Sequence, residues 1–481
     1  MRESMRRAID VACSAGAEYA DVRFFSQRAQ YIMTSDMRVR TITDSDVTGF
    51  GVRVLVDGCW GFSGSGRVEP AEMERVADRA VAIARAGCRL RNDGGVRLAP
   101  LAPSQGVWCT AIEQDPFEVS MQDKVELLLA VSEELFRNPE IRKSFGIMQF
   151  IRTERRIISS EGTDIEATQY ISNVGYQASA VGNGDVRSRM FFWPAMSRGY
   201  ELVTEAPLLQ EAGRIAAEAV ELLHAPESPS GEFDLILDPA HLSLVIHESV
   251  GHATELDRVL GMEESLAGRS FATPDKVNQF AYGSSLVNLT ADTTFPGGLA
   301  TMGWDDDGVP GTCWPIVKDG ILAGYATNRE VAPLVDQDFS RGCNRADHWG
   351  SVPIVRIPNL SLEAGKTPLS LDELIADTKL GIYMEGRGSW SIDQMRLNFQ
   401  FGADAAWLIK DGTRRHMLKN VIYQSITPEF WGSCDAVCDQ RSWRPFGITN
   451  CGKGDPGQLS MMTHGAAPAR FRKVKVGGIK P

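Results

Sequence analysis

A proline-rich break divides the chain into two halves of different character. Residues 224–233, HAPESPSGEF, bring two prolines and a glycine together directly after an apolar helical pattern. Because 481 residues exceed what a single hydrophobic core usually contains, a boundary between domains is expected within the chain. We therefore predict an N-terminal domain over residues 1–225 and a C-terminal domain over residues 226–481.

The N-terminal half alternates helical and strand patterns and reads as two parts. A first strand-rich block covers residues 20–66, and the Asp57-Gly58 pair between two apolar runs predicts a β-hairpin there. Residues 91–118 are rich in glycine and proline and are expected to form a linker. A second strand-rich block extends to residue 195 or so. Helices are predicted over residues 2–17, 70–87, 119–137 and 206–223.

The C-terminal half begins with FDLILDP, which is typical of a buried strand followed by a helix start. Asp238 is a plausible N-cap and Pro239 a first helical residue, so a helix is expected from residue 239. Beyond residue 280 the pattern is mostly β, with two further Asp-Gly pairs, at 319–320 and 411–412, between apolar runs. The predicted fold class is α+β: a two-part N-terminal α/β domain, then a β-rich C-terminal domain that carries one important helix.

That helix carries two histidines five residues apart, His247 and His252, with Glu248 beside the first. Zinc peptidases commonly have H-E-x-x-H, in which the histidines are four apart and share one helical face. Five residues apart in a regular helix, they differ by roughly 140° and cannot bind one metal ion. A π-bulge restacks residues five apart, and Gly251 would ease that distortion. The motif thus predicts a metal site only where the helix is locally widened.

A catalytic zinc ion usually has three protein ligands, so a third is needed. Glu263 or Glu264, on a following helix, and Cys451, in the glycine-rich loop GITNCGKGDPGQ, are the candidates. Cys434 and Cys438 have a metal-like C-x-x-x-C spacing but no second pair. Three further histidines are isolated in the sequence and are interpreted as structural or surface residues: His348, His416 and His464.

Composition excludes several classes of function. A formal net charge of −12 and a pI near 5.2 argue against a nucleic-acid-binding surface. No run of about 18 uninterrupted apolar residues is present, so we predict no membrane span. Glu3 and Asp10 interrupt the charged start, which argues against a signal peptide. Nine scattered cysteines without framework spacing predict free thiols and a cytoplasmic location.

Four segments, in order along nearly the whole chain, resemble the TldD/PmbA (TldE) family of zinc metalloproteases. They are AEYADVRFFSQ with GFGVRVLVDGCWGFSGSG, then VIHESVGHATELD, then DDDGVPGTCWPIVKDGILAGYATNR, and finally NCGKGDPGQ. The last is slightly longer than the family's C-G-K-x-G-Q loop, which puts the details of the loop in question more than its cysteine. Because the histidine motif is present, the chain resembles the catalytic TldD type, whereas the PmbA/TldE type lacks the motif.

The resemblance implies a zinc ion (Zn2+) held by His247, His252 and Cys451, with Glu248 as the catalytic base. It also implies hydrolysis of unfolded or flexible peptides, in turnover or in peptide maturation. The family works as dimers, so we expect a dimer with a TldE/PmbA-like paralogue, or with a second copy of the chain. The sequence does not identify the residue that stabilises the oxyanion. The candidates, by residue type alone, are Tyr383, Arg387, Lys453 and His464.

Two other interpretations stay open at the level of sequence. A dipeptidyl-peptidase III-like enzyme also uses H-E-x-x-x-H and would employ Glu263 or Glu264 rather than Cys451. A non-catalytic peptide-binding or assembly subunit would instead hold a structural metal. The number of ligands discriminates between catalysis and structure, because a structural zinc site is closed by four protein ligands and a catalytic site keeps one position open.

Overall fold

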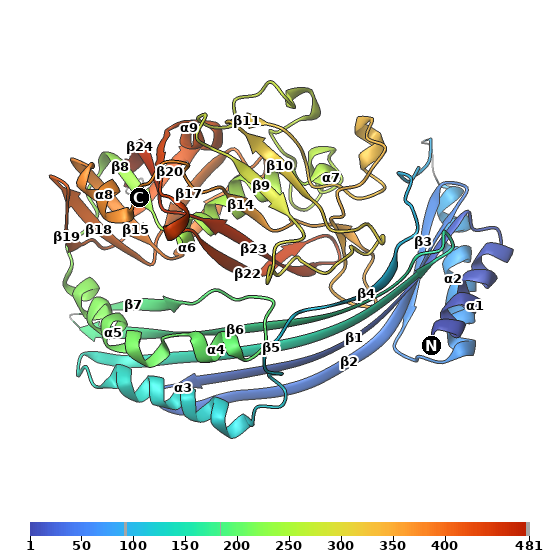
Figure 1. The fold of residues 1–481 in the computed structure, drawn as a ribbon, viewed down its shortest axis with the longest axis horizontal. Coiled ribbons are helices and arrows are strands. Elements are labelled where there is room, and N and C mark those ends of the chain that lie inside the picture. The colour runs from blue at the N-terminus through green and yellow to red at the C-terminus, as the bar shows by residue number, and fades with distance from the viewer. Residues whose placement is uncertain (91–93, 183, 478–481) are drawn as a thin grey trace.

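The computed structural model describes residues 1–90, 94–182 and 184–477. Within the N-terminal half, one seven-stranded sheet has the order β3-β2-β1-β5-β6-β4, with β7 paired to β6. Its long strands curve beneath the C-terminal half (Figure 1). The strands are β1 (Tyr19–Ser35), β2 (Arg38–Val56), β3 (Cys59–Ser65), β4 (Gln105–Cys109), β5 (Ile141–Ser159), β6 (Asp164–Gly182) and β7 (Asp185–Phe192).

Two separate helical layers cover this sheet, which confirms the two-part character of the N-terminal half. Helices α1 and α2 gather at one end, and α3, α4 and α5 at the other (Figure 1). Each layer encloses its own apolar cluster, because each longer helix turns an amphipathic face to the strands. The helices are α1 (Arg2–Ser14), α2 (Pro70–Cys88), α3 (Met121–Phe136), α4 (Glu201–Glu205) and α5 (Leu208–His224).

The predicted linker is partly wrong. Residues 105–109 of the expected linker 91–118 form β4, which pairs in parallel with β6 from Gln105 opposite Asp164 onward. The sequence there, QGVWC, is too short for its pattern to be distinguished from a loop, so only the neighbouring strand reveals it. Residues 91–93 of the same segment lie outside the described residues.

The prediction that all nine cysteines are free is also wrong. Cys59, at the start of β3, and Cys88, at the end of α2, form a disulfide with Cα atoms 5.6 Å apart. The two residues are 29 positions apart in the sequence, and only the packing of α2 on β3 brings them together. The other seven cysteines are free.

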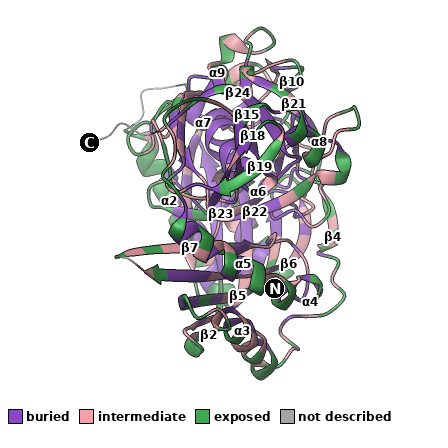
Figure 2. Cartoon of the chain, turned by 90° about the vertical axis from the view of Figure 1, so that its left-hand side faces the viewer, coloured by how far each residue is buried: buried purple, intermediate pink, exposed green. Residues whose placement is uncertain are grey.

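The C-terminal half is built mainly of strands, as predicted. A nine-stranded sheet has the order β16-β17-β20-β24-β8-β15-β18-β19, with β21 paired to β24, and the pair β22–β23 stands apart from it. Buried residues concentrate in the interior of this half (Figure 2). The strands of these two sheets are β8 (Gly231–Leu237), β15 (Leu380–Glu385), β16 (Trp390–Ile392), β17 (Asn398–Gly402), β18 (Ala405–Lys410), β19 (Thr413–Met417), β20 (Ile422–Ile426), β21 (Cys434–Val437), β22 (Arg444–Lys453), β23 (Gln458–Ala466) and β24 (Ala469–Val476).

The remaining elements of this half are short. A four-stranded sheet has the order β11-β10-β9-β14, and β12 and β13 form a two-stranded sheet. Their bounds are β9 (Leu289–Asp292), β10 (Cys313–Lys318), β11 (Ile321–Leu322), β12 (Asn344–Arg345), β13 (Ile354–Val355) and β14 (Leu360–Leu362). The helices are α6 (Pro239–Ile246), α7 (Leu256–Val259), α8 (Leu371–Ala376) and α9 (Thr427–Gly432). No helix in the described part of the chain is long and apolar enough to cross a membrane.

The three Asp-Gly pairs predicted to form hairpin turns do so, between β2 and β3, β10 and β11, and β18 and β19. In each pair both residues have a positive φ, between 48° and 79°. Two central residues with positive φ define the type I′ turn, whose twist matches that of the flanking strands. Glycine and aspartate tolerate this region of backbone space, which explains why the local sequence was sufficient to predict the turns.

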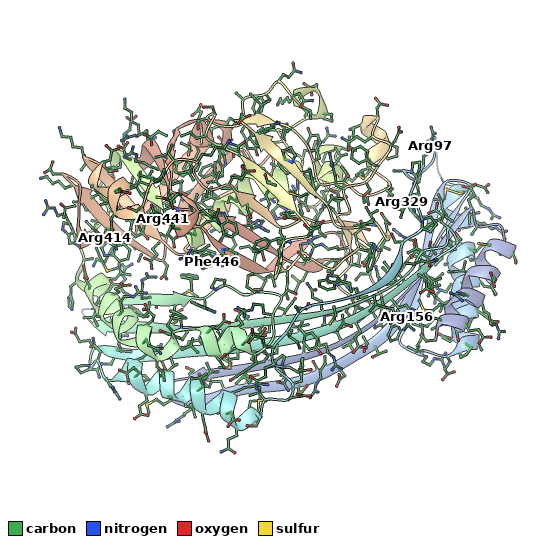
Figure 3. The ribbon with its side chains drawn as sticks, viewed as in Figure 1. Arg97, Arg156, Arg329, Arg414, Arg441 and Phe446 are labelled. Carbon is green, nitrogen blue, oxygen red and sulfur yellow. A yellow bond between two sulfur atoms is a disulfide. The ribbon has the colours of Figure 1, made fainter. Side chains whose placement is uncertain are left out.

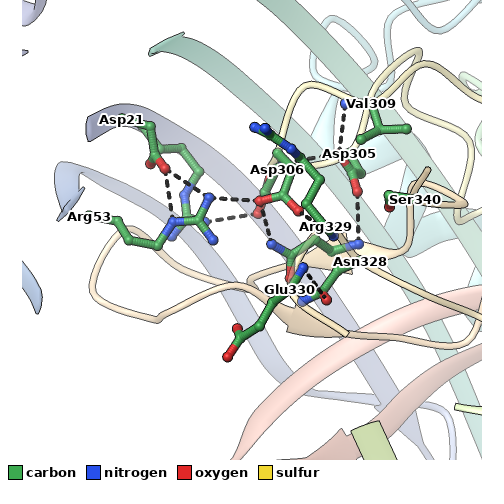
Figure 4. Close-up of polar contacts among 12 residues, drawn as sticks. Asp21, Arg53, Asp305, Asp306, Val309, Asn328, Arg329, Glu330 and Ser340 are labelled. Atoms are coloured by element: carbon green, nitrogen blue, oxygen red, sulfur yellow. Dashed lines mark hydrogen bonds and ion pairs between the residues drawn. The ribbon is translucent and has the colours of Figure 1, made fainter. Parts of the chain in front are cut away.

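Buried ion pairs join the two halves. Arg53 of β2 donates to Asp21 at 2.8 Å (Figure 4) and also donates to Asp307 of the C-terminal half at 2.7 Å. At the other end of the sheet, the buried Arg189 of β7 forms ion pairs with Glu385 and Asp404 of the C-terminal half. These contacts join the sheet to the C-terminal half at two places, and Figure 3 shows Phe446 of β22 at the boundary between the halves.

Candidate metal centre

The histidine helix is widened at the position where the spacing requires it. Helix α6 begins as predicted, with Asp238 accepting the N–H of His241 at 2.7 Å. A π-helical turn, His247–Gly251, follows, in which the N–H of His252 donates to the carbonyl of His247. An i→i+5 bond stacks residues five apart. The two histidine rings therefore lie on one side, with centroids 4.8 Å apart.

Side chains from distant elements support this π-turn at Ser249. The hydroxyl of Tyr282 donates to the Ser249 carbonyl at 2.5 Å, and the indole N–H of Trp431 donates to the Ser249 hydroxyl at 3.0 Å. Gly251 has a φ of −53°, which any residue can adopt. A side chain there would lie 3.0 Å from Ile357, so glycine supplies space at this position rather than conformational freedom.

Cys451 of β22 completes a cluster of three buried ligand candidates. One ligand atom each from His247, His252 and Cys451 lie within 4.8 Å of one another. The Sγ of Cys451 is 3.5 Å from the Nε2 of His252. Zinc bonds of usual length at a tetrahedral angle would separate sulfur and nitrogen by roughly 3.6 Å, so this pair fits a zinc ion. The cluster contains no fourth histidine, cysteine or acidic ligand among the described residues.

His464 fixes the tautomer of His247. The Nδ1 of His464 lies 2.8 Å from the carbonyl of Leu360 and must donate to it, because a carbonyl only accepts. Burial lowers the pKa of His464 to about 3, so its other nitrogen, Nε2, is an acceptor. The Nδ1–H of His247 therefore donates to it at 2.9 Å, which leaves the Nε2 of His247 free for a metal ion.

Glu255 orients the second histidine in the same way. Its Oε2 accepts the Nδ1–H of His252 at 2.7 Å, and Lys453 lies 3.2 Å from its other oxygen. Burial lowers the pKa of His252, but the Cys451 thiolate and the Glu255 carboxylate outweigh it and raise that pKa to about 9. A metal ion at Nε2 would replace the proton held there, because coordinated imidazole is neutral.

The surroundings of Cys451 favour the thiolate form of its sulfur. Burial raises its pKa, but the charges of His252 and Arg356 outweigh burial and lower it overall. A guanidinium nitrogen of Arg356 lies 3.2 Å from Sγ and 2.6 Å from the Cys451 carbonyl. Thiolate is the form of cysteine that binds metal ions.

Glu248 lies at the surface of a cleft beside these ligands. Its Oε2 accepts a hydrogen bond of 2.8 Å from Arg396, and its Oε1 has no hydrogen-bond partner among the described residues. Arg396 has a φ of +62°, a strained backbone conformation for a residue with a side chain, in the turn between β16 and β17. Because Arg396 occupies one oxygen of the carboxylate, the other is left free to accept a proton.

The cleft has a volume of about 690 Å³ and lies between the N-terminal sheet and the candidate metal centre. Three strands that have a strand neighbour on one side only, within the part of the chain that the structure describes, contribute residues to its walls: β7, β16 and β22. Six consecutive residues of β22, 447–452, line it. Aromatic side chains from β7, β16 and the segment after β7 also line the walls: Phe191, Phe192, Trp193 and Trp390. The cleft thus offers strand edges and flat apolar surfaces close to the three ligand candidates.

The structure does not bring the alternative ligands to the cluster. Glu263 and Glu264 lie in turns rather than on the expected helix, and Glu264 pairs with Arg269 at 2.6 Å. Cys434 and Cys438 are buried thiols whose pKa burial raises to about 12, and neither joins a metal-binding group among the described residues.

The other residues considered from the sequence have different places. His348 packs against Phe25 and Trp349, and His416 is exposed on β19. His464 is isolated in the sequence, but in the structure it is buried and contacts His247. Of the four oxyanion candidates, Arg387 alone lines the cleft.

The oxyanion candidates Tyr383 and Lys453 are engaged away from the cleft. Tyr383 stacks on Trp407, and Lys453 forms a buried ion pair with Asp257 at 2.7 Å. The residues that sequence reasoning missed are Glu255, Arg356 and Arg396. Only Glu255 has a local signal, since it lies three residues after His252 in the same motif.

Three family domains match the sequence, in order. They are described as PmbA/TldA metallopeptidase domain 1 at residues 20–84, the central domain at residues 114–225 and the C-terminal domain at residues 230–478. The third alone covers more than half of the chain and includes the histidine motif and Cys451.

Similar proteins extend over the whole chain. A Methanothermobacter thermautotrophicus protein named metalloprotease is 28% identical over 96% of each chain. A Saccharolobus solfataricus protein named zinc metalloprotease TldD homolog is 22% identical over 98% of this chain and all of its own. Among solved structures, TldE from Thermococcus kodakarensis shares the fold with a TM-score of 0.77, at 16% identity, over 99% of this chain and 100% of its own.

Proposed function

Since this chain belongs to the PmbA/TldD metallopeptidase family and is a metallopeptidase, we propose that it hydrolyses unfolded or flexible peptides with one zinc ion. His247, His252 and Cys451 hold the ion in this proposal, and Glu248 is the catalytic base. The observation that carries it is the π-turn, which costs regular helix geometry and brings His247 and His252 to Cys451 at a cleft.

The residues around the ion have distinct parts in the proposed reaction. Bound zinc would polarise the scissile carbonyl and acidify a water molecule. Glu248 takes a proton from the attacking water at Oε1 and passes it to the leaving nitrogen. Arg396 holds Oε2 of that carboxylate at 2.8 Å, so that the free oxygen keeps one orientation. His464 and Glu255 orient the two imidazoles.

The number of ligands favours catalysis over a structural metal. A structural zinc site is usually closed by four protein ligands, whereas three ligands leave one position for water or substrate. The described residues supply three, at the wall of a cleft that an extended peptide could enter. The positions of Glu263 and Glu264, outside the cluster, speak against the dipeptidyl-peptidase III-like alternative.

We propose that substrates bind as an added strand. Residues of β7, β16 and β22 line the cleft, and each of these strands has one side without a strand partner among the described residues. Main-chain hydrogen bonds to such an edge bind peptides with little demand on sequence. A folded domain cannot offer such a strand, since its backbone groups are already paired. The biological role would then be peptide turnover or maturation. We place it in the cytoplasm, because seven cysteines, Cys451 among them, are free, the Cys59–Cys88 pair being the exception.

Selectivity for unfolded substrates is a direct test of the proposed function. We expect a disordered peptide library to be hydrolysed at least about 10³-fold faster than a stable folded protein, because a folded domain is unfolded only for about 10⁻³–10⁻⁶ of the time. The measurement is a mixed digest by the zinc-loaded protein, followed by mass spectrometry, with Glu248→Gln as the control for contaminating proteases. Equal rates on the two substrates would contradict strand addition.

We also propose that the active form is a dimer, with a motif-less paralogue as the favoured partner and a second copy as the alternative. The structure of TldE from Thermococcus kodakarensis has the same fold over its whole length, which supports one scaffold for both types. The N-terminal sheet has an unpaired strand edge at which a partner subunit could bind. Residues 38–48 of β2 have no partner on β3, and Ile42 among them is 46% exposed.

Sedimentation of the protein, alone and co-expressed with such a paralogue, should show a dimer. Ile42→Glu should shift the dimer toward monomer, because it places a charge on the unpaired edge. Ile83→Glu, on α2 and exposed to a similar 41%, is the matched control and should leave the dimer intact. A monodisperse, fully active monomer would refute the proposed assembly.

A further inference from the structure

Arg387 occupies a fixed position in the wall of the cleft. It follows Gly386 in the loop after β15. The backbone N–H and the backbone carbonyl of Gly386 both form hydrogen bonds with residues at the start of α6. Its N–H donates to Asp238 at 3.0 Å, and its carbonyl lies 2.8 Å from the Nδ1 of His241, which donates to it. The helix that carries the candidate metal ligands thus also positions Arg387.

The guanidinium of Arg387 has no carboxylate partner. Its Nη2 donates to the carbonyl of Gly447 at 3.0 Å, its Nε is buried without a hydrogen-bond partner, and no acidic group lies within ion-pair distance among the described residues. Burial lowers its pKa to about 10, against the opposing charge of Asp238, so it remains a cation at neutral pH. Asp238 is itself engaged by the N–H groups of His241 and Gly386.

Among the described charged side chains that line the cleft, Arg387 is the cation without a counter-charge. Glu248 is the only acidic residue among the described residues of its lining, and Arg396 already pairs with it at 2.8 Å. A half-buried cation without a carboxylate partner gains most from a ligand that supplies one, since a guanidinium and a carboxylate match in geometry and charge.

We propose that Arg387 is a subsite for a carboxylate of the peptide substrate, either the C-terminal carboxylate or an Asp or Glu side chain. The proposal rests on the peptidase function above and adds a preference to it. Arg387 would be a binding residue that selects where the peptide is cut.

The position of Arg387 along β22 sets the distance between the carboxylate and the cut. Gly447, its hydrogen-bond acceptor, precedes Cys451 by four residues in the same strand. At about 3.3 Å per residue these positions are roughly 13 Å apart, and the register shift after Ile448 shortens this span slightly. A peptide extended along β22 would thus carry the recognised carboxylate about three or four residues from the hydrolysed bond.

The test compares flexible peptides, free of Asp and Glu, made as C-terminal acids and as amides. We expect the zinc-loaded protein to cut the acids three or four residues before the end, with a kcat/KM about 10–100-fold above the amides, as a charge-assisted hydrogen bond allows. In Arg387→Met this ratio should fall to about one. Lys366→Met, which removes an exposed charge that does not line the cleft, should keep it. Amidated peptides with one internal Glu distinguish the two sources, since a side chain that binds would restore cutting before that Glu.

Binding to Glu248→Gln protein separates this inference from the peptidase function. Titration with the same acids and amides should give the same 10–100-fold preference without turnover, and the double variant with Arg387→Met should lose it. A wild-type protein that hydrolyses no peptide would refute the proposed function, while the titration would still decide the subsite. Equal affinity for acids and amides, or a preference that survives Arg387→Met, would overturn the subsite.

Discussion

Glu248→Gln is expected to lower kcat/KM for peptide hydrolysis by about 10²–10⁴-fold while leaving zinc content and thermal stability unchanged. The substitution keeps the volume of the side chain, and the amide oxygen can still accept the hydrogen bond that Arg396 donates to Glu248 at 2.8 Å. An amide cannot take up the proton that the free Oε1 accepts in the proposed reaction. The loss should therefore fall on kcat, since the ligands and the cleft are unchanged.

The measurement combines steady-state kinetics on a flexible peptide with elemental analysis and a thermal melt of the same preparation. Glu264→Gln is the matched control, because it makes the same chemical change at an exposed ion pair with Arg269 and should keep full activity. Turnover within about tenfold of the wild-type protein would mean that another group carries the proton.

The geometry of the histidine helix could be predicted from the sequence because it is a local property. Two histidines five apart can share a metal ion only if the turn is widened, and the structure has a π-turn at His247–Gly251. The three Asp-Gly turns are local for the same reason, since each depends on the φ that two adjacent residues tolerate. Asp238 as N-cap needs only the residues beside it.

The surroundings of the metal centre could not be predicted, because they depend on contacts between residues far apart in the sequence. His464 is 217 residues from His247, and its role follows from the pairing of β22 with β23, which places Cys451 opposite Ser460. Alternation along β23 puts residues 460, 462 and 464 on one face, but the register shift after Ile448 hides this relation in the sequence. Arg356 reaches Cys451 from 95 residues away and leaves no pattern at all.

The two features of the fold that the sequence did not predict, β4 and the Cys59–Cys88 disulfide, also depend on contacts between distant segments. Strand β4 is recognised only by its parallel pairing with β6, and Cys59 meets Cys88 only because α2 packs on β3. Neither contact produces a periodic pattern in the sequence, because each joins one short segment to a distant one. At Gly251 the sequence predicts backbone flexibility. The contact with Ile357 shows instead that the position has no space for a side chain.

Cys451→Ala is expected to remove most of the bound zinc and with it all measurable hydrolysis. The thiolate is the only anionic atom among the three ligand candidates, and its Sγ lies 3.5 Å from the Nε2 of His252, close to a tetrahedral edge. Alanine leaves two neutral imidazoles, so the loss of affinity should exceed the roughly 10–100-fold that a missing outer-shell partner costs. His464→Phe, which removes such a partner of His247, should give that smaller loss.

Elemental analysis after dialysis against a weak chelator would measure the two effects on one scale. Cys438→Ala is the matched control, because Cys438 is buried like Cys451, with 0% against 4% exposure, but lies outside the ligand cluster and should keep its zinc. Full retention of zinc by Cys451→Ala, with loss in a Glu263→Ala, Glu264→Ala double variant, would favour the dipeptidyl-peptidase III-like arrangement instead. We expect the opposite result, in which Cys451→Ala loses zinc and the double variant keeps it. The π-turn brings His247 and His252 to the thiolate, and without that ligand the widened turn would have no metal site to complete.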